Sequence, residues 1–382
     1  MIERLLQHEI NKFIGKIPVV AIIGARQVGK TTLAKRLISG LNNVVFLDLE
    51  KSSDRQMISE TEVFLNLNKG KTICIDEIQI QPQIFAELRS FIDENKDTNF
   101  IILGSSSPDL LRQSSESLAG RIYYFELHSF LWLEVNNTVE MQKYRLRGGI
   151  PLSLLADSDE DAFQWLENYI KTFLERDLRT FGYNIPPDTL RRLWQMLAHN
   201  NGQSINYSSL GNSMGLSHST IRNYVDILAG TFMLRILQPY HTNLKKRLVK
   251  APKVYFRDVG VLHSLLRIQN YDDLFINPVY GSSWEVIVIE NIIAKYKGWN
   301  HNYYRTAKGN EIDLVLSKAN RTIAIEIKAS PTPKLTRGFW LALRDINATE
   351  AYVIAPVRMP YPLKDNVMVY SLEDFLGKKD DY

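Results

Sequence analysis

A glycine-bounded loop between an apolar run and a helical pattern is the feature that most constrains this chain. The run Ile17–Ile23 leads into Gly24-Ala25-Arg26-Gln27-Val28-Gly29-Lys30-Thr31-Thr32. The two glycines let the backbone curl, so that successive N–H groups converge on phosphate oxygens at a helix N-terminus. Lys30 can reach the β- and γ-phosphates of ATP, and the Thr31 hydroxyl can bind Mg²⁺. The loop therefore predicts a nucleotide-binding site over residues 24–32; the alternative is a glycine turn that binds nothing.

Three further apolar segments follow this loop, and helical segments lie between them. They cover residues 44–49, 71–79 and 99–104. Near-continuous apolar strands that alternate with helices predict a parallel sheet covered on both faces. Ligands of such sheets bind at the carboxyl ends of the strands, where this chain has its polar residues.

Two acids and a serine stand at those strand ends. Asp76 ends a buried strand and is expected to hold Mg²⁺ through its water shell, while Glu77 would orient or deprotonate the attacking water. An acid pair that merely caps a core strand is the alternative. Ser105 is placed to sense the γ-phosphate, although a serine-rich turn at 105–107 explains it almost equally well.

Composition adds bounds rather than a function. The chain has 382 residues, a formal charge of +4 and a single cysteine, Cys74. These values allow several domains, exclude an internal disulfide framework and fit a reducing compartment. No apolar stretch approaches the length of a membrane span and the first residues lack a signal-peptide core, so we expect a cytoplasmic protein without a membrane partner.

A helix-turn-helix pattern with basic residues occupies the middle of the chain. Residues 206–216 predict a helix and a glycine turn, and Ser217 caps a second helix over 218–228. Ser219, Thr220, Arg222 and Asn223 would face a major groove. Residues 232–237 and 253–256 predict the strands of a wing, with Lys245-Lys246-Arg247 between them for phosphate contacts. DNA is the favoured partner, RNA the weaker one, and a protein-binding winged helix with solvated charges is the alternative.

The last hundred residues carry a second set of chemical groups. Glu285 lies in a predicted helix, Asp313 in a strand, and Glu326 and Lys328 at the end of the next strand, on one face of it. Asp313 and Glu326 could bind Mg²⁺ or Mn²⁺, and Lys328 could position water for attack on a phosphodiester. This D…E-x-K order resembles the PD-(D/E)xK nuclease fold. Salt bridges at strand ends, in a fold that cuts nothing, are the alternative.

Several sequence blocks also resemble one family along nearly the whole chain: the prokaryotic AAA+-type ATPases whose C-terminal region carries the DUF4143 module. The blocks are GARQVGKTT, residues 46–50, 75–79, 103–107, 118–121, 130–134, 147–151 and 173–178. The resemblance implies that Arg121 completes a neighbouring or its own ATP site. Completion in trans would require a homo-oligomer. The alternative for Arg121 is an arginine that caps a carboxylate on the sheet.

Together these patterns predict an α/β protein: a P-loop NTPase parallel-sheet core, then a winged-helix domain and a PD-(D/E)xK nuclease-like α/β domain. The expected boundaries are 1–135 for the ATPase core, 136–187 for a helical lid, 188–278 for the winged helix and 279–382 for the nuclease-like domain. The expected function is a Mg²⁺-dependent ATPase that acts on DNA. The second hypothesis is an ATP-dependent switch or scaffold whose C-terminal domains are interaction surfaces.

Overall fold

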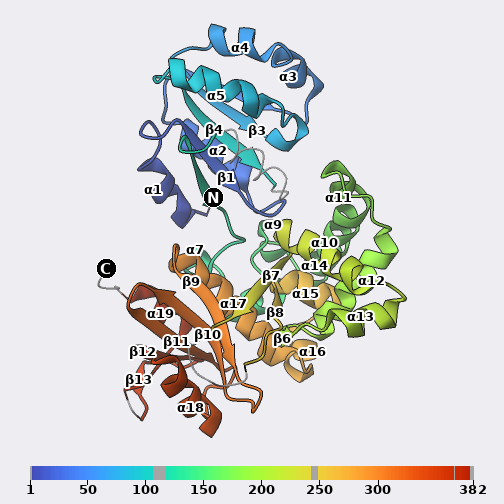
Figure 1. Cartoon of the computed structure of the whole chain (residues 1–382), viewed down its shortest axis with the longest axis vertical. Coiled ribbons are helices and arrows are strands. Elements are labelled where there is room, and N and C mark those ends of the chain that lie inside the picture. Colours follow the sequence, from blue (N-terminus) through green and yellow to red (C-terminus); the bar gives the residue numbers. More distant parts are fainter. Residues whose placement is uncertain (1, 106–117, 242–247, 365, 379–382) are drawn as a thin grey trace.

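The computed structural model of the chain describes residues 2–105, 118–241, 248–364 and 366–378. Two predicted features fall outside these ranges, namely the serines at 106 and 107 and the basic run Lys245-Lys246-Arg247. The chain forms an upper part, which is the predicted ATPase core, and a larger lower body, and a short linker after residue 126 connects them (Figure 1).

The ATPase core is built on five parallel strands in the order β2-β3-β4-β1-β5. Its strands are β1 (Val19–Ile23), β2 (Val44–Asp48), β3 (Thr72–Asp76), β4 (Asn99–Gly104) and β5 (Ile122–Glu126). Its helices are α1 (Leu5–Asn11), α2 (Lys30–Ile38), α3 (Ser52–Met57), α4 (Thr61–Leu67) and α5 (Ile84–Glu94). The predicted parallel sheet is therefore confirmed.

Alternating strand residues fill two separate hydrophobic layers, one on each face of this sheet. Val19 and Ile102 pack with α4 and α5, whereas their neighbours Val20 and Ile101 pack with α1 and α2. This alternation follows from the period of two along a strand. Because all five strands are parallel, their carboxyl ends meet at one edge, and the loop between β1 and α2 lies there.

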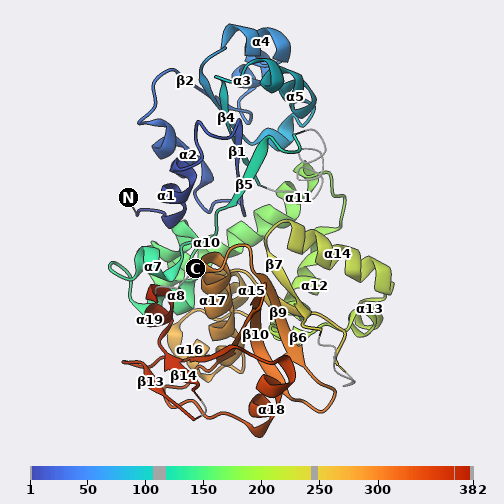
Figure 2. The same ribbon diagram turned by 60° about the vertical axis from the view of Figure 1, so that its left-hand side comes forward.

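The next part of the chain begins the lower body and is mostly helical (Figure 2). They are α7 (Trp132–Val135), α8 (Met141–Arg147), α9 (Pro151–Leu154), α10 (Asp159–Thr172), α11 (Leu178–Thr180), α12 (Pro187–His199), α13 (Tyr207–Met214), α14 (His218–Gly230), α15 (Val259–Leu265) and α16 (Tyr271–Ile276). One π-helical turn, at Phe173–Asp177, joins α10 to α11. The predicted helix-turn-helix segments form α13 and α14, with Gly215 in the left-handed region between them and Ser217 as the N-cap of α14.

A nine-stranded sheet runs through the lower body in the order β13-β14-β12-β11-β10-β9-β7-β8-β6. The strands are β6 (Gln203–Ser204), β7 (Leu234–Pro239), β8 (Lys253–Phe256), β9 (Asn300–Arg305), β10 (Glu311–Lys318), β11 (Arg321–Ile327), β12 (Glu350–Ile354), β13 (Tyr361–Pro362) and β14 (Met368–Tyr370). The helices α17 (Tyr280–Lys295), α18 (Arg337–Ile346) and α19 (Leu372–Gly377) complete it. No helix among the described residues has the length and apolar character that crossing a membrane requires.

The regions on either side of the predicted boundary between residues 278 and 279 share one sheet, and the boundary itself stays a prediction. β7 pairs with β9 in parallel, with Gln238 opposite Asn302 and Pro239 opposite Tyr303. One continuous hydrophobic core extends from Phe130 to Leu376. The apolar helix α17 packs inside it, against α8, α15, α19 and β11. The sequence pattern separated these regions because a single parallel pairing between distant strands leaves no local signal.

Candidate functional site

The glycine-bounded loop has the strained backbone that its sequence predicts. Gly24 has φ +155°, and a Cβ atom there would lie 2.4 Å from the carbonyl oxygen of Leu127. Gly29, at φ +98°, precedes α2, and Gln27 is also left-handed, with φ 61°. Only glycine fits the first position, because any side chain would collide with the chain that follows β5. The loop thus curls back toward its own helix.

Lys30 lies under this curl, and its ammonium group donates to the carbonyl oxygens of Gly24 at 3.0 Å and Ala25 at 2.8 Å. Burial lowers the pKa of Lys30 to about 8, although the carboxylates of Glu77 and Asp76 act in the opposite direction. These carbonyl oxygens are hydrogen-bond partners of the buried ammonium group. The lysine is held ready at the point where a nucleotide's phosphates would bind.

Asp76 and Thr31 meet beside the lysine. The Thr31 hydroxyl donates to Asp76 Oδ2 at 2.6 Å. Asp76 is 3% exposed, and this burial raises the pKa of its carboxyl group. A hydroxyl and a buried carboxylate are hard oxygen ligands, so the pair fits the Mg²⁺ ion that accompanies ATP in P-loop enzymes, where the ion neutralises charge on the phosphates.

Glu77 stands next to this pair in a left-handed conformation, with φ 55°. Its carboxylate accepts hydrogen bonds from Ser105 Oγ at 3.2 Å and from the Gln79 amide, which also donates to Ser105 at 3.1 Å. The structure thus brings Lys30, Thr31, Asp76, Glu77 and Ser105 together. Gln79 was missed as a site residue, although it belongs to one of the sequence blocks quoted above.

Arg26 of the loop contacts the helical lid. Its guanidinium pairs with Asp177 in the π-helical turn and donates to Glu50 at 3.1 Å. The Tyr169 hydroxyl of α10 donates to the carbonyl oxygen of Arg26 at 3.4 Å. The contact of Arg26 with Asp177 was not predicted, because the two residues are 151 positions apart in the sequence.

Arg121 does not reach the phosphate-binding loop. Its guanidinium forms two hydrogen bonds with Asp93 of α5, at 2.6 and 2.8 Å, and its backbone precedes β5. Because β5 is parallel to β1, Arg121 lies at the edge of the sheet opposite the loop. A role in its own ATP site is therefore wrong, and the arginine caps a carboxylate as the alternative stated. A role toward a neighbouring copy stays a prediction.

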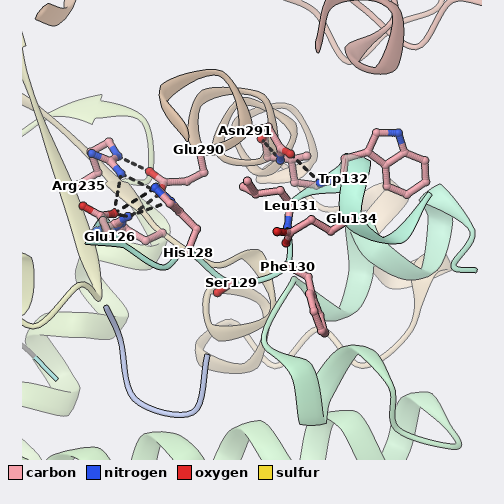
Figure 3. Close-up of polar contacts among 12 residues, drawn as sticks. Glu126, His128, Ser129, Phe130, Leu131, Trp132, Glu134, Arg235, Glu290 and Asn291 are labelled. Atoms are coloured by element: carbon pink, nitrogen blue, oxygen red, sulfur yellow. Dashed lines mark hydrogen bonds and ion pairs between the residues drawn. The ribbon is translucent and has the colours of Figure 1, made fainter. Parts of the chain in front are cut away.

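A buried group of charged residues joins the ATPase core to the lower body (Figure 3). Glu290 of α17 accepts from Arg235 at 2.9 Å and from Arg257 at 3.0 Å. Arg257 also pairs with Glu126, the last residue of β5, and lies 3.2 Å from His128 Nδ1. Burial alone would raise the pKa of Glu126, but Arg257, His128 and Arg235 lower it to about 2. These five residues form what we call the junction cluster.

Arg4, also missed by the sequence analysis, supports the loop from the other side. It donates to the carbonyl oxygen of Val28 at 2.8 Å and to Glu134 of α7 at 3.1 Å. Asn291 of α17 accepts from the Trp132 backbone N–H at 2.7 Å in the same region (Figure 3). The loop is thus fixed against both parts of the molecule. No local sequence pattern marks an arginine that acts across this distance.

A second site lies in the lower body, in a cavity of about 750 Å³. The four predicted residues of the D…E-x-K pattern all line it: Glu285, Asp313, Glu326 and Lys328. Lys328 donates to Glu326 at 2.6 Å, and the Ile327 N–H donates to Asp313 at 2.9 Å. The structure therefore brings together what the sequence predicted from two strands and a helix. We call this cavity the acidic cleft.

Three residues of the acidic cleft were not predicted: Lys253, Tyr255 and Glu311. Lys253 of β8 lies 2.5 Å from Glu311 and 3.9 Å from Asp313, and the Tyr255 hydroxyl donates to Glu285 at 2.8 Å. Burial and Asp313 raise the pKa of Glu285 to about 7 and that of Glu326 to about 8. Within the described part of the chain, Glu326 Oε2 is a buried oxygen without a hydrogen-bond partner.

Across the residues that the structure describes, no three or more Asp, Glu, His or Cys side chains are grouped so that they could hold a metal ion. The ammonium group of Lys253 forms an ion pair with Glu311 and lies near the carboxylate of Asp313. The predicted roles of Asp313 and Glu326 as ligands of Mg²⁺ or Mn²⁺ therefore stay predictions.

Helix α14 presents the polar residues that its sequence predicts. Ser219, Arg222 and Asn223 are exposed, and Thr220 is half-buried at the capped first turn. Arg222 forms a loose pair with Asp226 at 3.9 Å. The apolar residues on the other side of α14, including Ile221 and Val225, pack in the core of the lower body.

Three family models match successive parts of the chain. A family model described as an AAA domain matches residues 16–136. Two domains of unknown function match the remainder, DUF8612 at residues 138–272 and DUF4143 at residues 280–375. An uncharacterised protein of Mycobacterium tuberculosis is 37% identical over 96% of this chain and 83% of that protein. The chain belongs to the AAA-type ATPases with a DUF4143 C-terminal region.

Other members and structures are more distant from this AAA-type ATPase. An uncharacterised protein of Methanocaldococcus jannaschii is 24% identical over 85% of this chain and 78% of that protein. A solved Walker-type ATPase of Pyrococcus abyssi is 14% identical, with a TM-score of 0.48 over 70% of this chain and 96% of that one. The family implies nucleotide binding and, as is usual for P-loop enzymes, use of Mg²⁺.

Proposed function

We propose that this AAA-type ATPase hydrolyses ATP with Mg²⁺ and engages DNA through helix α14, and that the acidic cleft is a nuclease-like module. The observation that carries the ATPase proposal is the contact of Thr31 with Asp76 beside the buried Lys30. In this scheme Lys30 neutralises charge on the γ-phosphate, and Glu77 orients the attacking water from its position beside Ser105.

The DNA proposal rests on the order of elements and on exposed side chains. Helix α12, strand β6, helices α13 and α14, and the β7–β8 pair follow one another, with β8 antiparallel to both β6 and β7. A helix-turn-helix followed by two strands is the arrangement in which the later helix enters a major groove. Arg222 and Asn223 are the exposed residues on α14 that would contact DNA.

DNA binding is tested with a fluorescently labelled duplex by anisotropy, at two salt concentrations. We expect the Arg222→Ala/Asn223→Ala variant to bind several-fold more weakly. The slope of the logarithm of its binding constant against the logarithm of salt concentration should be smaller by about one, which corresponds to one lost phosphate contact. Arg89→Ala, which removes an exposed arginine from α5 of the ATPase core, is the matched control and should bind as the wild type does. Equal binding by all three proteins would refute the role of α14.

A second candidate function has an observation in its favour. The described residues of the acidic cleft leave no ready metal centre, and this favours a switch or scaffold whose C-terminal module does not cut. The two candidates separate in one assay with plasmid and linear DNA, Mg²⁺ or Mn²⁺, and ATP present or absent. Cleavage that disappears in Lys328→Ala supports the nuclease; intact ATPase activity without cleavage in any condition supports the scaffold. The same assay with RNA tests the weaker substrate.

A further inference from the structure

We infer that the ammonium group of Lys253 is the resident cation of the acidic cleft and keeps divalent metal ions out of it. The inference rests on the second candidate function, in which the C-terminal module does not cut, and it adds a residue from outside the D…E-x-K pattern. Lys253 is 3% exposed, and its Nζ lies 2.5 Å from Glu311 and 3.9 Å from Asp313.

The charge of the cleft explains why a cation is needed there. Four carboxylates line it, from Glu285, Glu311, Asp313 and Glu326. Lys328 is paired with Glu326 at 2.6 Å, so it compensates one of them. Lys253 is the second lysine of the cleft and lies on the other side, toward Glu311. Among the described residues, Glu326 Oε2 is a buried oxygen without a hydrogen-bond partner. It is therefore a ligand atom that a metal ion could use, and the nearby charge of Lys253 opposes such binding.

The position of Lys253 is fixed by the sheet. All four residues of β8 are buried, and β8 lies between β6 and β7. Ser204 and Leu237 pair with Lys253 on either side. Its buried side chain is paired with carboxylates of the cleft, because a buried ammonium group without a partner is strongly unfavourable. The ring of Tyr303, with its centroid 5.4 Å from Nζ, adds a favourable contact.

Lysine and a divalent metal ion would compete for the same oxygens. Mg²⁺ and Mn²⁺ bind carboxylate oxygens at about 2.0–2.2 Å, much closer than an ammonium group approaches. A metal ion bound to Asp313 would therefore place a double positive charge within a few ångström of the buried ammonium group of Lys253. Repulsion between the two cations lowers the metal affinity of the intact protein.

The test measures Mn²⁺ binding by isothermal titration calorimetry without nucleotide. We expect Lys253→Met to bind Mn²⁺ at least tenfold more tightly than the wild type, and Lys253→Arg to behave as the wild type does. The double variant Lys253→Met/Asp313→Asn should lose this gain, which assigns the binding to the cleft. Unchanged or weaker Mn²⁺ binding by Lys253→Met would overturn the inference. Should Lys253→Met fail to fold, Lys253→Gln removes the charge while it retains donors for Glu311, and the same comparison decides.

Cleavage assays on the same proteins separate this inference from the nuclease proposal. Tighter Mn²⁺ binding by Lys253→Met without cleavage of plasmid DNA supports the inference and refutes the nuclease. Wild-type protein that takes up Mn²⁺ in the cleft as tightly as Lys253→Met, and cuts DNA with it, overturns the inference and supports the nuclease.

Discussion

Replacing Glu290 by glutamine should destabilise the lower body strongly. The carboxylate of Glu290 is 9% exposed and holds two guanidinium groups, from Arg235 and Arg257, at 2.9 and 3.0 Å. The substitution leaves two largely buried arginines, whose side chains are 17% and 10% exposed, with Glu126 as their shared carboxylate. Losing one partner of a buried charge pair costs about 3–5 kcal/mol, because the remaining charge stays desolvated. At about 1.4 kcal/mol for each factor of ten, the unfolding equilibrium constant should rise by roughly two to four orders of magnitude.

Urea denaturation followed by tryptophan fluorescence measures this effect selectively. All six tryptophans lie between residues 132 and 340, so the signal reports the lower body and not the ATPase core. The matched control is Asp226→Asn, which removes one carboxylate from an exposed pair on α14 and should cost less than about 0.5 kcal/mol. A double-mutant cycle with Arg235→Met should show that the second substitution costs less when Glu290 is already neutral. A loss below about 1 kcal/mol for Glu290→Gln would refute the reasoning.

Three further predictions concern the ATP site and one glycine. Lys30→Ala should abolish ATP binding. In the wild type, ATP binding above pH 8 should take up a proton, because the pKa of Lys30 without nucleotide is about 8 and phosphates favour its charged form. The affinity for ATP should therefore fall as the pH rises, and calorimetry in buffers of different ionisation enthalpy measures the proton uptake. Glu77→Gln should bind ATP but hydrolyse it at least about a hundredfold more slowly in a phosphate-release assay, and near wild-type turnover would assign the water to another residue. Gly148→Ala should lower the free energy of unfolding by more than about 2 kcal/mol, because the φ of Gly148 is +74° and a Cβ atom there would lie 2.1 Å from Asp258 Oδ1. The control Gly182→Ala, at φ +85° with open space around it, should lower it by about half as much in the same urea titration.

The sequence was most informative where chemistry depends on neighbours along the chain. The phosphate-binding loop, Asp76 and Glu77 lie at strand ends within one regular α/β pattern, so their meeting at one sheet edge could be predicted. The pair Asp313 and Glu326 was equally accessible, since both belong to adjacent strands.

Residues that act across long separations could not be predicted in this way. Lys253 reaches the acidic cleft from β8, and its short strand Lys253–Phe256 resembles an ordinary hairpin arm. Arg26 meets Asp177 only because α10 and the π-helical turn fold back over the loop. Arg121 shows a different limit: a family resemblance suggested a role in its own or a neighbouring ATP site, but strand direction places it at the sheet edge away from its own loop.

The parallel pairing of β7 with β9 has a consequence for any attempt to dissect this protein. A fragment that begins after residue 278 would keep β9 but lose the strand beside it, and would expose a row of unpaired N–H and C=O groups. It would also lose Lys253 and Tyr255, which are the partners of Glu311 and Glu285 in the acidic cleft. Such a fragment should therefore self-associate, and its metal binding would not represent that of the intact acidic cleft.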